Sequence, residues 1–180
     1  AGFTHTCGVK TDGSVACWGA DNGDTSRDWG QVTDAPQAGT FEGVSAGLRH
    51  SCALEVGGGV QCWGDDSYGQ LSNAPTGTGY TQLSAGNHFT CALSSAGALE
   101  CWGRNNYGQL DYAGSSVFVG LDSGGDHGCG VTTSGTVECW GRDADGQSTP
   151  DSGTFEAVAA GGANTCGIDA FNAIRCWGDD

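Results

Sequence analysis

The chain has 180 residues and a formal net charge of −15, with 34 glycines, ten cysteines and only six lysines and arginines. Nucleic acids and anionic membrane surfaces are bound by clustered basic residues, which this chain lacks. The high glycine content disfavours helices, and no apolar run approaches the roughly 20 residues that span a membrane. We therefore expect an all-β domain of many short strands joined by tight turns.

The first predicted element is a β-hairpin within the first 19 residues that contains Cys7 and Cys17. If these cysteines face each other, Val9 pairs with Val15 and residues 11–13 form a three-residue loop. Such a loop places its last residue at positive φ, which glycine adopts freely and asparagine tolerates best among the others. The residues at this position in successive copies of the hairpin are Gly13, Gly58, Gly97, Gly135 and Asn172.

The hairpin opens a repeat that recurs five times, with first cysteines spaced by 37 to 45 residues. Each of the first four copies continues into a variable loop that contains Gly-Gln and then into a short apolar run, which we expect to be a strand. This period is too short for a strand–helix unit and fits the three or four short strands of one propeller blade. We predict a single β-propeller domain with repeats at 1–45, 46–84, 85–122, 123–159 and an incomplete 160–180.

The five hairpins are accompanied by only four apolar strands, at 41–44, 80–83, 118–121 and 155–158. We favour a five-bladed ring with one incomplete blade. The alternatives are that the chain is part of a larger propeller, or that a neighbouring chain supplies the missing strand across an open sheet edge and so forms a homo-oligomer.

The ten cysteines form five pairs with the same separation of ten residues. Directly opposed residues of an antiparallel hairpin are within reach of a disulfide, whereas zinc sites use pairs two to four residues apart. Free thiols in a reducing compartment are the other alternative. Disulfides predict an extracellular or cell-surface location. The predicted bonds are Cys7–Cys17, Cys52–Cys62, Cys91–Cys101, Cys129–Cys139 and Cys166–Cys176.

A Trp-Gly pair follows the second cysteine of every copy. Propeller sheets pack against their neighbours on both faces, so one large aromatic residue per blade indicates packing between blades. Ligand binding by these tryptophans is the alternative. They are Trp18, Trp63, Trp102, Trp140 and Trp177.

The combined string AG-x-x-H-[ST]-C-A-L … G-x-[VL]-x-C-W-G-x-[DN]-x-x-G-Q-L resembles the repeat of the regulator of chromosome condensation family, over essentially the whole chain. The disulfide-paired variant is similar to the secreted or surface-attached bacterial branch. The resemblance implies a propeller, usually of seven blades, that binds partners through one face. Family members include a nuclear exchange factor and a secreted inhibitor of β-lactamases. The acidic charge and the cysteines argue against a nuclear role for this chain.

Histidine recurs two residues before the first cysteine at His5, His50 and His127, whereas Phe89 and Asn164 stand there in the other copies. A ring of histidines could hold a metal ion. A position that accepts phenylalanine and asparagine instead indicates hydrogen bonding at a strand edge, and we predict no metal site.

The loops after Trp-Gly carry carboxylates and amides, the oxygen ligands that calcium prefers. None has the full twelve-residue calcium pattern, and aspartate or asparagine in such loops also bonds the backbone amides of the turn. We expect no cofactor, with calcium as the alternative. The residues are Asp21, Asn22, Asp65, Asp66, Asn105, Asn106, Asp143 and Asp145.

The residue before Gly-Gln is aromatic in three of the four loops. If these loops crowd one propeller face, the aromatic rings form exposed platforms that suit a protein partner or sugar rings; the alternative is that each ring packs under its own loop. The loop at 20–40 is the longest and differs most from the others, so asymmetric recognition would involve it. The candidate ligand-binding residues are Trp29, Tyr68, Tyr107, Asp66, Asn105, Asp143 and Asp145.

No set of nucleophile, base and orienting group breaks the repeat, so we predict no catalytic residue and no enzyme. We predict an extracellular binding module that recognises a protein through one propeller face. One alternative is a lectin whose loops each hold a sugar weakly and gain avidity together. A second is a structural subunit of a surface sheath or filament.

Overall fold

The computed structural model describes residues 1–20 and 28–179. All regular structure in these residues is β, as predicted, and consists of fourteen short strands in five antiparallel sheets. The described residues contain no helix long and apolar enough to cross a membrane. Asp21 and Asn22, two of the loop residues considered as calcium ligands, lie outside the described residues.

Four of the sheets contain three strands each, and the first sheet contains the hairpin β1-β2 alone. Each three-stranded sheet combines the apolar strand at the end of one sequence repeat with the hairpin of the next, so the sheets are offset from the repeats. The strands are β1 (His5–Val9), β2 (Val15–Gly19), β3 (Phe41–Ala46), β4 (His50–Glu55), β5 (Val60–Gly64), β6 (Tyr80–Ala85), β7 (Phe89–Ser94), β8 (Leu99–Gly103), β9 (Phe118–Ser123), β10 (His127–Thr132), β11 (Val137–Gly141), β12 (Phe155–Ala160), β13 (Asn164–Asp169) and β14 (Ile174–Gly178).

The hairpins have the register that the sequence predicts. Cys7 lies opposite Cys17 and Val9 opposite Val15, and the other four hairpins repeat this pairing. All five predicted disulfides are present, with Cα atoms 4.0 to 4.1 Å apart. The last loop residue has positive φ in each hairpin, and Asn172, at φ 59°, is the one non-glycine residue with positive φ in the described chain.

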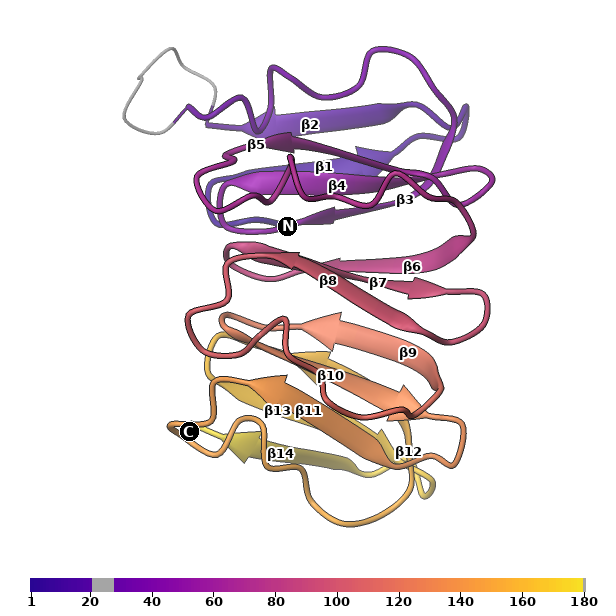
Figure 1. Ribbon diagram of the computed structural model, residues 1–180, viewed down its shortest axis with the longest axis vertical. Coiled ribbons are helices and arrows are strands. Elements are labelled where there is room, and N and C mark those ends of the chain that lie inside the picture. Colours follow the sequence, from indigo (N-terminus) through magenta and orange to yellow (C-terminus); the bar gives the residue numbers. More distant parts are fainter. Residues whose placement is uncertain (21–27, 180) are drawn as a thin grey trace.

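The five sheets lie side by side in chain order, and the first and last sheets are at opposite ends of the molecule (Figure 1). Contacts between sheets run from β1 to β3, from β3 to β6, from β6 to β9 and from β9 to β12. The structure therefore shows an open arc and does not show a closed five-bladed ring. An open arc agrees with the alternative of a partial propeller.

Glycine allows consecutive sheets to approach closely at the turn before each hairpin. A Cβ added to Gly47 would lie 2.3 Å from the carbonyl oxygen of Gly86, and one added to Gly86 would lie 2.5 Å from that of Gly124. Gly124 meets the carbonyl oxygen of Gly161 in the same way, at 2.3 Å. At Gly161 the nearest atoms belong to Asn164 of its own sheet, so the arc ends there.

The predicted packing of tryptophan between blades is confirmed for four of the five copies. Trp102 is 3% exposed, and its indole N–H donates to the backbone carbonyl of Gln70 in the preceding loop at 2.8 Å. Trp63, Trp140 and Trp177 make the same bond. Trp18, in the first sheet, is 57% exposed because no sheet of the described chain covers it.

The recurring histidines have the hydrogen-bonding role that the sequence indicates, and each joins two consecutive sheets. The Nε2 atom of each lies 2.7 to 2.8 Å from a hydroxyl oxygen of the next sheet. Burial, with a smaller contribution from neighbouring His88, lowers the pKa of His50 to about 4. The pairs are His5–Ser51, His50–Thr90 and His127–Thr165.

Candidate recognition face

Two sets of segments meet at one end of the sheets and form what we call the loop face. They are the loops after each Trp-Gly and the turns before each hairpin. In every copy, the backbone N–H of the residue after Trp-Gly donates to the last carbonyl of the turn, at 2.8 to 3.0 Å; the pairs are Ala20–Thr4, Asp65–Arg49, Arg104–His88, Arg142–Asp126 and Asp179–Ala163.

The glutamine of each Gly-Gln fixes the loop to the next sheet. The side-chain oxygen of the fully buried Gln70 accepts the backbone N–H of Tyr68 at 2.7 Å, while its backbone carbonyl accepts the indole N–H of Trp102. Gln109 binds the N–H of Tyr107 in the same way, at 2.8 Å. The backbone of the residue before Gly-Gln is therefore held in place by the side chain of a glutamine that is itself bound to the tryptophan between sheets. Sequence reasoning missed this role of the glutamine.

The three predicted aromatic residues occupy successive positions along the loop face. Tyr68 is 45% exposed and Tyr107 is 46% exposed, and Trp29 is half-buried. The two tyrosine rings thus do not pack wholly beneath their own loops, and their surfaces are available to a partner.

Arginine side chains lie against these aromatic rings. The guanidinium carbon of Arg104 is 5.3 Å from the ring centroid of Tyr68 and 5.8 Å from that of Tyr107, so it sits between rings from two consecutive loops. The guanidinium carbon of Arg142 also lies close to Tyr107, 5.5 Å from its ring centroid. The row Tyr68–Arg104–Tyr107–Arg142 therefore alternates aromatic and cationic groups, an arrangement favoured by cation–π attraction.

A second cation–aromatic pair precedes this row, where Arg49 lies 3.9 Å from the centroid of Trp29. Sequence reasoning did not include the arginines. The signal that could have found two of them is their common position directly after Cys-Trp-Gly, at Arg104 and Arg142.

His88 adds a nitrogen heterocycle to the row, with its ring centroid 5.1 Å from that of Tyr68. Burial and the positive charge of Arg104 lower the pKa of His88. Both effects favour the neutral imidazole, which does not repel the neighbouring guanidinium.

The predicted acidic and amide residues point back into their own loops. Asp66 accepts the backbone N–H groups of Leu71 and Ser72 at 2.8 and 3.0 Å, and these bonds lower its pKa against the opposing effect of burial. Asn105 accepts the N–H of Leu110 at 3.0 Å. The side chains of Asp66 and Asn105 thus stabilise their own loops by accepting backbone N–H groups.

Asp143 and Asp145 complete the predicted set. Asp143 accepts the backbone N–H of Ser148 at 2.8 Å and the hydroxyl of Thr149 at 2.7 Å. Asp145 pairs with Arg142 at 3.7 Å. No group of three or more His, Cys, Asp or Glu residues in the described chain is arranged to hold a metal ion.

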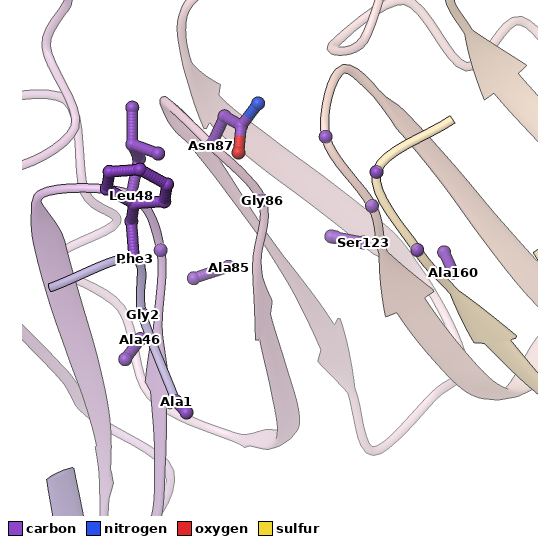
Figure 2. Close-up of a pocket in the computed structure, with 15 residues that line it drawn as sticks. Ala1, Gly2, Phe3, Ala46, Leu48, Ala85, Gly86, Asn87, Ser123 and Ala160 are labelled. Carbon is purple, nitrogen blue, oxygen red and sulfur yellow. The ribbon is translucent and has the colours of Figure 1, made fainter. Parts of the chain in front are cut away.

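A depression of about 220 Å³ lies where the turns of the five sheets converge. Ala1, Ala46, Ala85, Ser123 and Ala160 lie along it (Figure 2). Its rim carries Phe3, which is 79% exposed, together with Leu48 and Asn87. Among the described residues, no acidic, basic or histidine side chain lines this depression.

A family model of the regulator of chromosome condensation (RCC1) repeat matches residues 41–70, 80–109 and 118–147, which make up half of the chain. The chain belongs to the RCC1 repeat family. Each matched RCC1 repeat runs from the start of an apolar strand through the hairpin to the glutamine of Gly-Gln. A comparison with curated proteins found no match.

Solved structures of RCC1-like propellers resemble the whole described arc. The ectodomain of the Physcomitrella patens receptor kinase CR4 has 26% identity and a TM-score of 0.82, over 98% of this chain and 50% of that one. The CRINKLY WD40 ectodomain of Arabidopsis thaliana ACR4 has 25% identity and a TM-score of 0.78, over 99% and 63%. Prp20p from Saccharomyces cerevisiae, at 16% identity, has a TM-score of 0.81 over 98% and 56%.

These comparisons confirm the predicted propeller fold. This chain spans between half and two thirds of the length of each of these three proteins. They match the open arc over almost all of its residues.

Proposed function

We propose that this chain is an extracellular binding module that recognises a protein partner through its loop face, without catalysis. The observation that carries the proposal is the row Tyr68–Arg104–Tyr107–Arg142, in which two tyrosines that are nearly half exposed alternate with two arginines. Tyrosine, tryptophan and arginine are the residue types that dominate the binding energy of protein interfaces.

The distribution of charge supports the same face. The chain carries only six lysines and arginines against 21 acidic residues. Three of the six, Arg49, Arg104 and Arg142, lie on the loop face against aromatic rings. Acidic side chains of this face are engaged with their own loops or with Arg142, so a partner that presents carboxylates to the arginines gains charge-assisted hydrogen bonds.

An extracellular location is supported by the five disulfides, because such bonds persist in oxidising compartments. Two of the similar structures are receptor kinase ectodomains. Prp20p is described by its binding to Gsp1p and histones, which supports protein recognition as a use of this fold.

Carbohydrate binding is the second candidate, because the exposed rings of Tyr68 and Tyr107 offer flat surfaces on which a sugar ring can stack. The two candidates differ in their need for arginine. A sugar platform depends on the tyrosine rings, whereas a carboxylate-bearing protein depends on Arg104 as well.

The test is selection of binders from a displayed library of secreted-protein fragments, with a glycan array run in parallel. Arg104→Ala and Tyr107→Ala should each weaken the selected protein fragments by tenfold or more. The matched control is Phe171→Ala, since Phe171 is 87% exposed but lies in a hairpin loop at the other end of the sheets. Glycan binding that is lost in Tyr68→Ala and Tyr107→Ala but kept in Arg104→Ala would replace the protein-binding proposal by the lectin. Equal binding of the fragments to all variants would refute the loop face as the site.

A further inference from the structure

The strands β3, β6, β9 and β12, which contact one another from sheet to sheet, differ in the residue at their third position. In each strand this residue pairs with the fifth residue of the neighbouring hairpin strand, so the four positions are structurally equivalent. Their side chains range from a single hydrogen to a full carboxamide. The residues are Gly43, Gln82, Gly120 and Ala157.

The carboxamide of Gln82 joins β6 to β9. Its Nε2 donates to the backbone carbonyl of Leu121 at 3.1 Å, and its Oε1 accepts the backbone N–H of Leu121 at 3.2 Å. A single primary amide therefore satisfies both backbone groups of one residue in the next sheet. Because both groups bond Gln82, they point away from β10, with which Leu121 pairs through Gly130.

The boundaries that have glycine in place of this glutamine contain pockets. One of about 220 Å³ lies between β3 and β6 beside Gly43, and one of about 140 Å³ lies between β9 and β12 beside Gly120. A Cβ added to Gly43 would meet only the Cβ of Leu54, at 3.9 Å, and one added to Gly120 would meet nothing within 4 Å. The space that the Gln82 side chain fills at its own boundary is thus open at these two.

Leu83 in β6 and Val158 in β12 hold the position of Leu121, and each lines one of the two pockets. All three residues pair with the fourth residue of their hairpin strand. The backbone N–H and C=O of Leu83 and Val158 therefore point toward the preceding sheet, as those of Leu121 do. Within residues 1–20 and 28–179, no side chain bonds these groups as Gln82 bonds Leu121.

The remaining walls of both pockets suit an aliphatic stem. Each pocket has several times the roughly 30 Å³ that one water molecule occupies in the liquid, so it has room for more than a water molecule on the backbone groups. The apolar side chains are Val44, Leu54 and Leu83 in the first pocket and Leu121, Val131 and Val158 in the second.

One glutamate borders each pocket, Glu42 the first and Glu156 the second. Both side chains are exposed, and no described residue forms a hydrogen bond or an ion pair with them. Their negative charge disfavours a carboxylate ligand, which also lacks the N–H that the backbone carbonyl needs. A primary carboxamide is neutral and supplies both the donor and the acceptor.

We propose that the pockets beside Gly43 and Gly120 each bind a primary carboxamide on a short aliphatic stem, the group that a glutamine side chain carries. The carboxamide donates to the backbone carbonyl of Leu83 or Val158 and accepts the N–H of the same residue. These pockets share no residue with the cation–aromatic row, so the proposal goes beyond the proposed function and is tested separately from it.

The experiment is a titration of the ¹⁵N-labelled 180-residue chain, with its disulfides intact, with butanamide. Nuclear magnetic resonance should show saturable shifts at the amides of Leu83 and Val158. The amide of Leu121 serves as an internal control, because Gln82 already occupies it, and it should not respond. Butanoate, which has the same stem and a carboxylate in place of the amide, should give no saturable shift at any of the three.

Variants of the glycines and of the glutamine should exchange the sites. Gly43→Gln supplies its own carboxamide and should weaken the response of Leu83 at least tenfold while leaving that of Val158 unchanged; Gly120→Gln should do the reverse. The unchanged pocket of each variant shows that the fold is intact. Gly43→Ala, which adds a Cβ without an amide, is the matched control and should still bind. Gln82→Gly should open a third site and make Leu121 respond.

A capped Gly-Gln-Gly peptide with an N-methylamide end distinguishes the two sources of the ligand. Saturable shifts with the peptide would assign the pockets to a glutamine of a partner polypeptide, and shifts with butanamide alone would assign them to a free small amide. The proposal is overturned if butanamide gives no saturable shift at Leu83 and Val158. An equal response of Leu83 in Gly43→Gln and in the unmodified chain would also overturn it, as would a silent Leu121 in Gln82→Gly.

Discussion

Replacing Trp102 by alanine should destabilise the fold far more than the same change at Trp18. Trp102 is 3% exposed, packs against Cys52 and Ala92, and donates to the carbonyl of Gln70 at 2.8 Å. Truncation of a buried tryptophan costs about 3–5 kcal/mol, and leaving the carbonyl of Gln70 without a donor adds about 1 kcal/mol. Trp18 is 57% exposed, and its truncation should cost about 1 kcal/mol.

The assay is equilibrium unfolding in urea without added oxidant or reductant, so that the disulfides stay intact. Unfolding is monitored by circular dichroism. Both substitutions lie directly after a disulfide in the same hairpin position, so local strand propensity is matched. The two sites differ in that Trp102 lies in a three-stranded sheet and contacts the preceding sheet, whereas Trp18 lies in a two-stranded sheet and is exposed. The slope of free energy against urea should be unchanged in both variants. Equal destabilisation by the two changes would refute the view that these tryptophans stabilise the boundary between sheets rather than their own hairpin.

Three further changes test other parts of the structure. The pKa of His50 is lowered from 6.5 to about 4 in the fold, so the unfolded chain binds a proton more readily than the folded chain. The free energy of unfolding should therefore fall by about 2 kcal/mol as the pH is lowered from 7 to 5. Urea unfolding of His50→Gln should show a smaller fall over the same pH range. Asn172 has φ 59°, so Asn172→Gly should change the melting temperature little, whereas Asn172→Val should cost about 1–2 kcal/mol; equal melting temperatures would contradict the turn geometry. Gln70→Ala removes the acceptor of the Tyr68 N–H and should lower the free energy of unfolding by about 1–2 kcal/mol. Hydrogen exchange should become faster at the Tyr68 amide in particular, which distinguishes release of the loop from a general loss of stability.

The hairpins could be predicted residue by residue because local chemistry determines them. Cys7 and Cys17 fix the register, and the need for positive φ explains both Gly13 and Asn172. The packing of tryptophan between sheets could also be predicted, since a large aromatic residue repeated once per blade is best buried between neighbouring sheets. The exposure of Trp18 could not be predicted from local sequence, because it depends on whether another sheet packs against the first sheet.

The cation–aromatic row could be predicted only in part. The aromatic positions follow from the Gly-Gln repeat, but Arg104 lies against Tyr68, which is 36 residues earlier and belongs to the preceding loop. That contact depends on the stacking distance and rotation between consecutive sheets. The open arc has the same origin, because closure of a ring depends on the angle between consecutive sheets as well as on the number of repeats.

The Gly-Gln-Trp connection explains how a variable face can stand on a constant fold. Gln70 uses its backbone carbonyl to bind Trp102 at the sheet boundary and its side chain to hold the amide of Tyr68 at the surface. The backbone amide does not depend on which side chain residue 68 carries, and the fourth loop has Asp145 in the same bond to Gln147, at 2.9 Å. Substitutions at this position can therefore change what the loop face recognises without removing the bond that joins the loop to the fold.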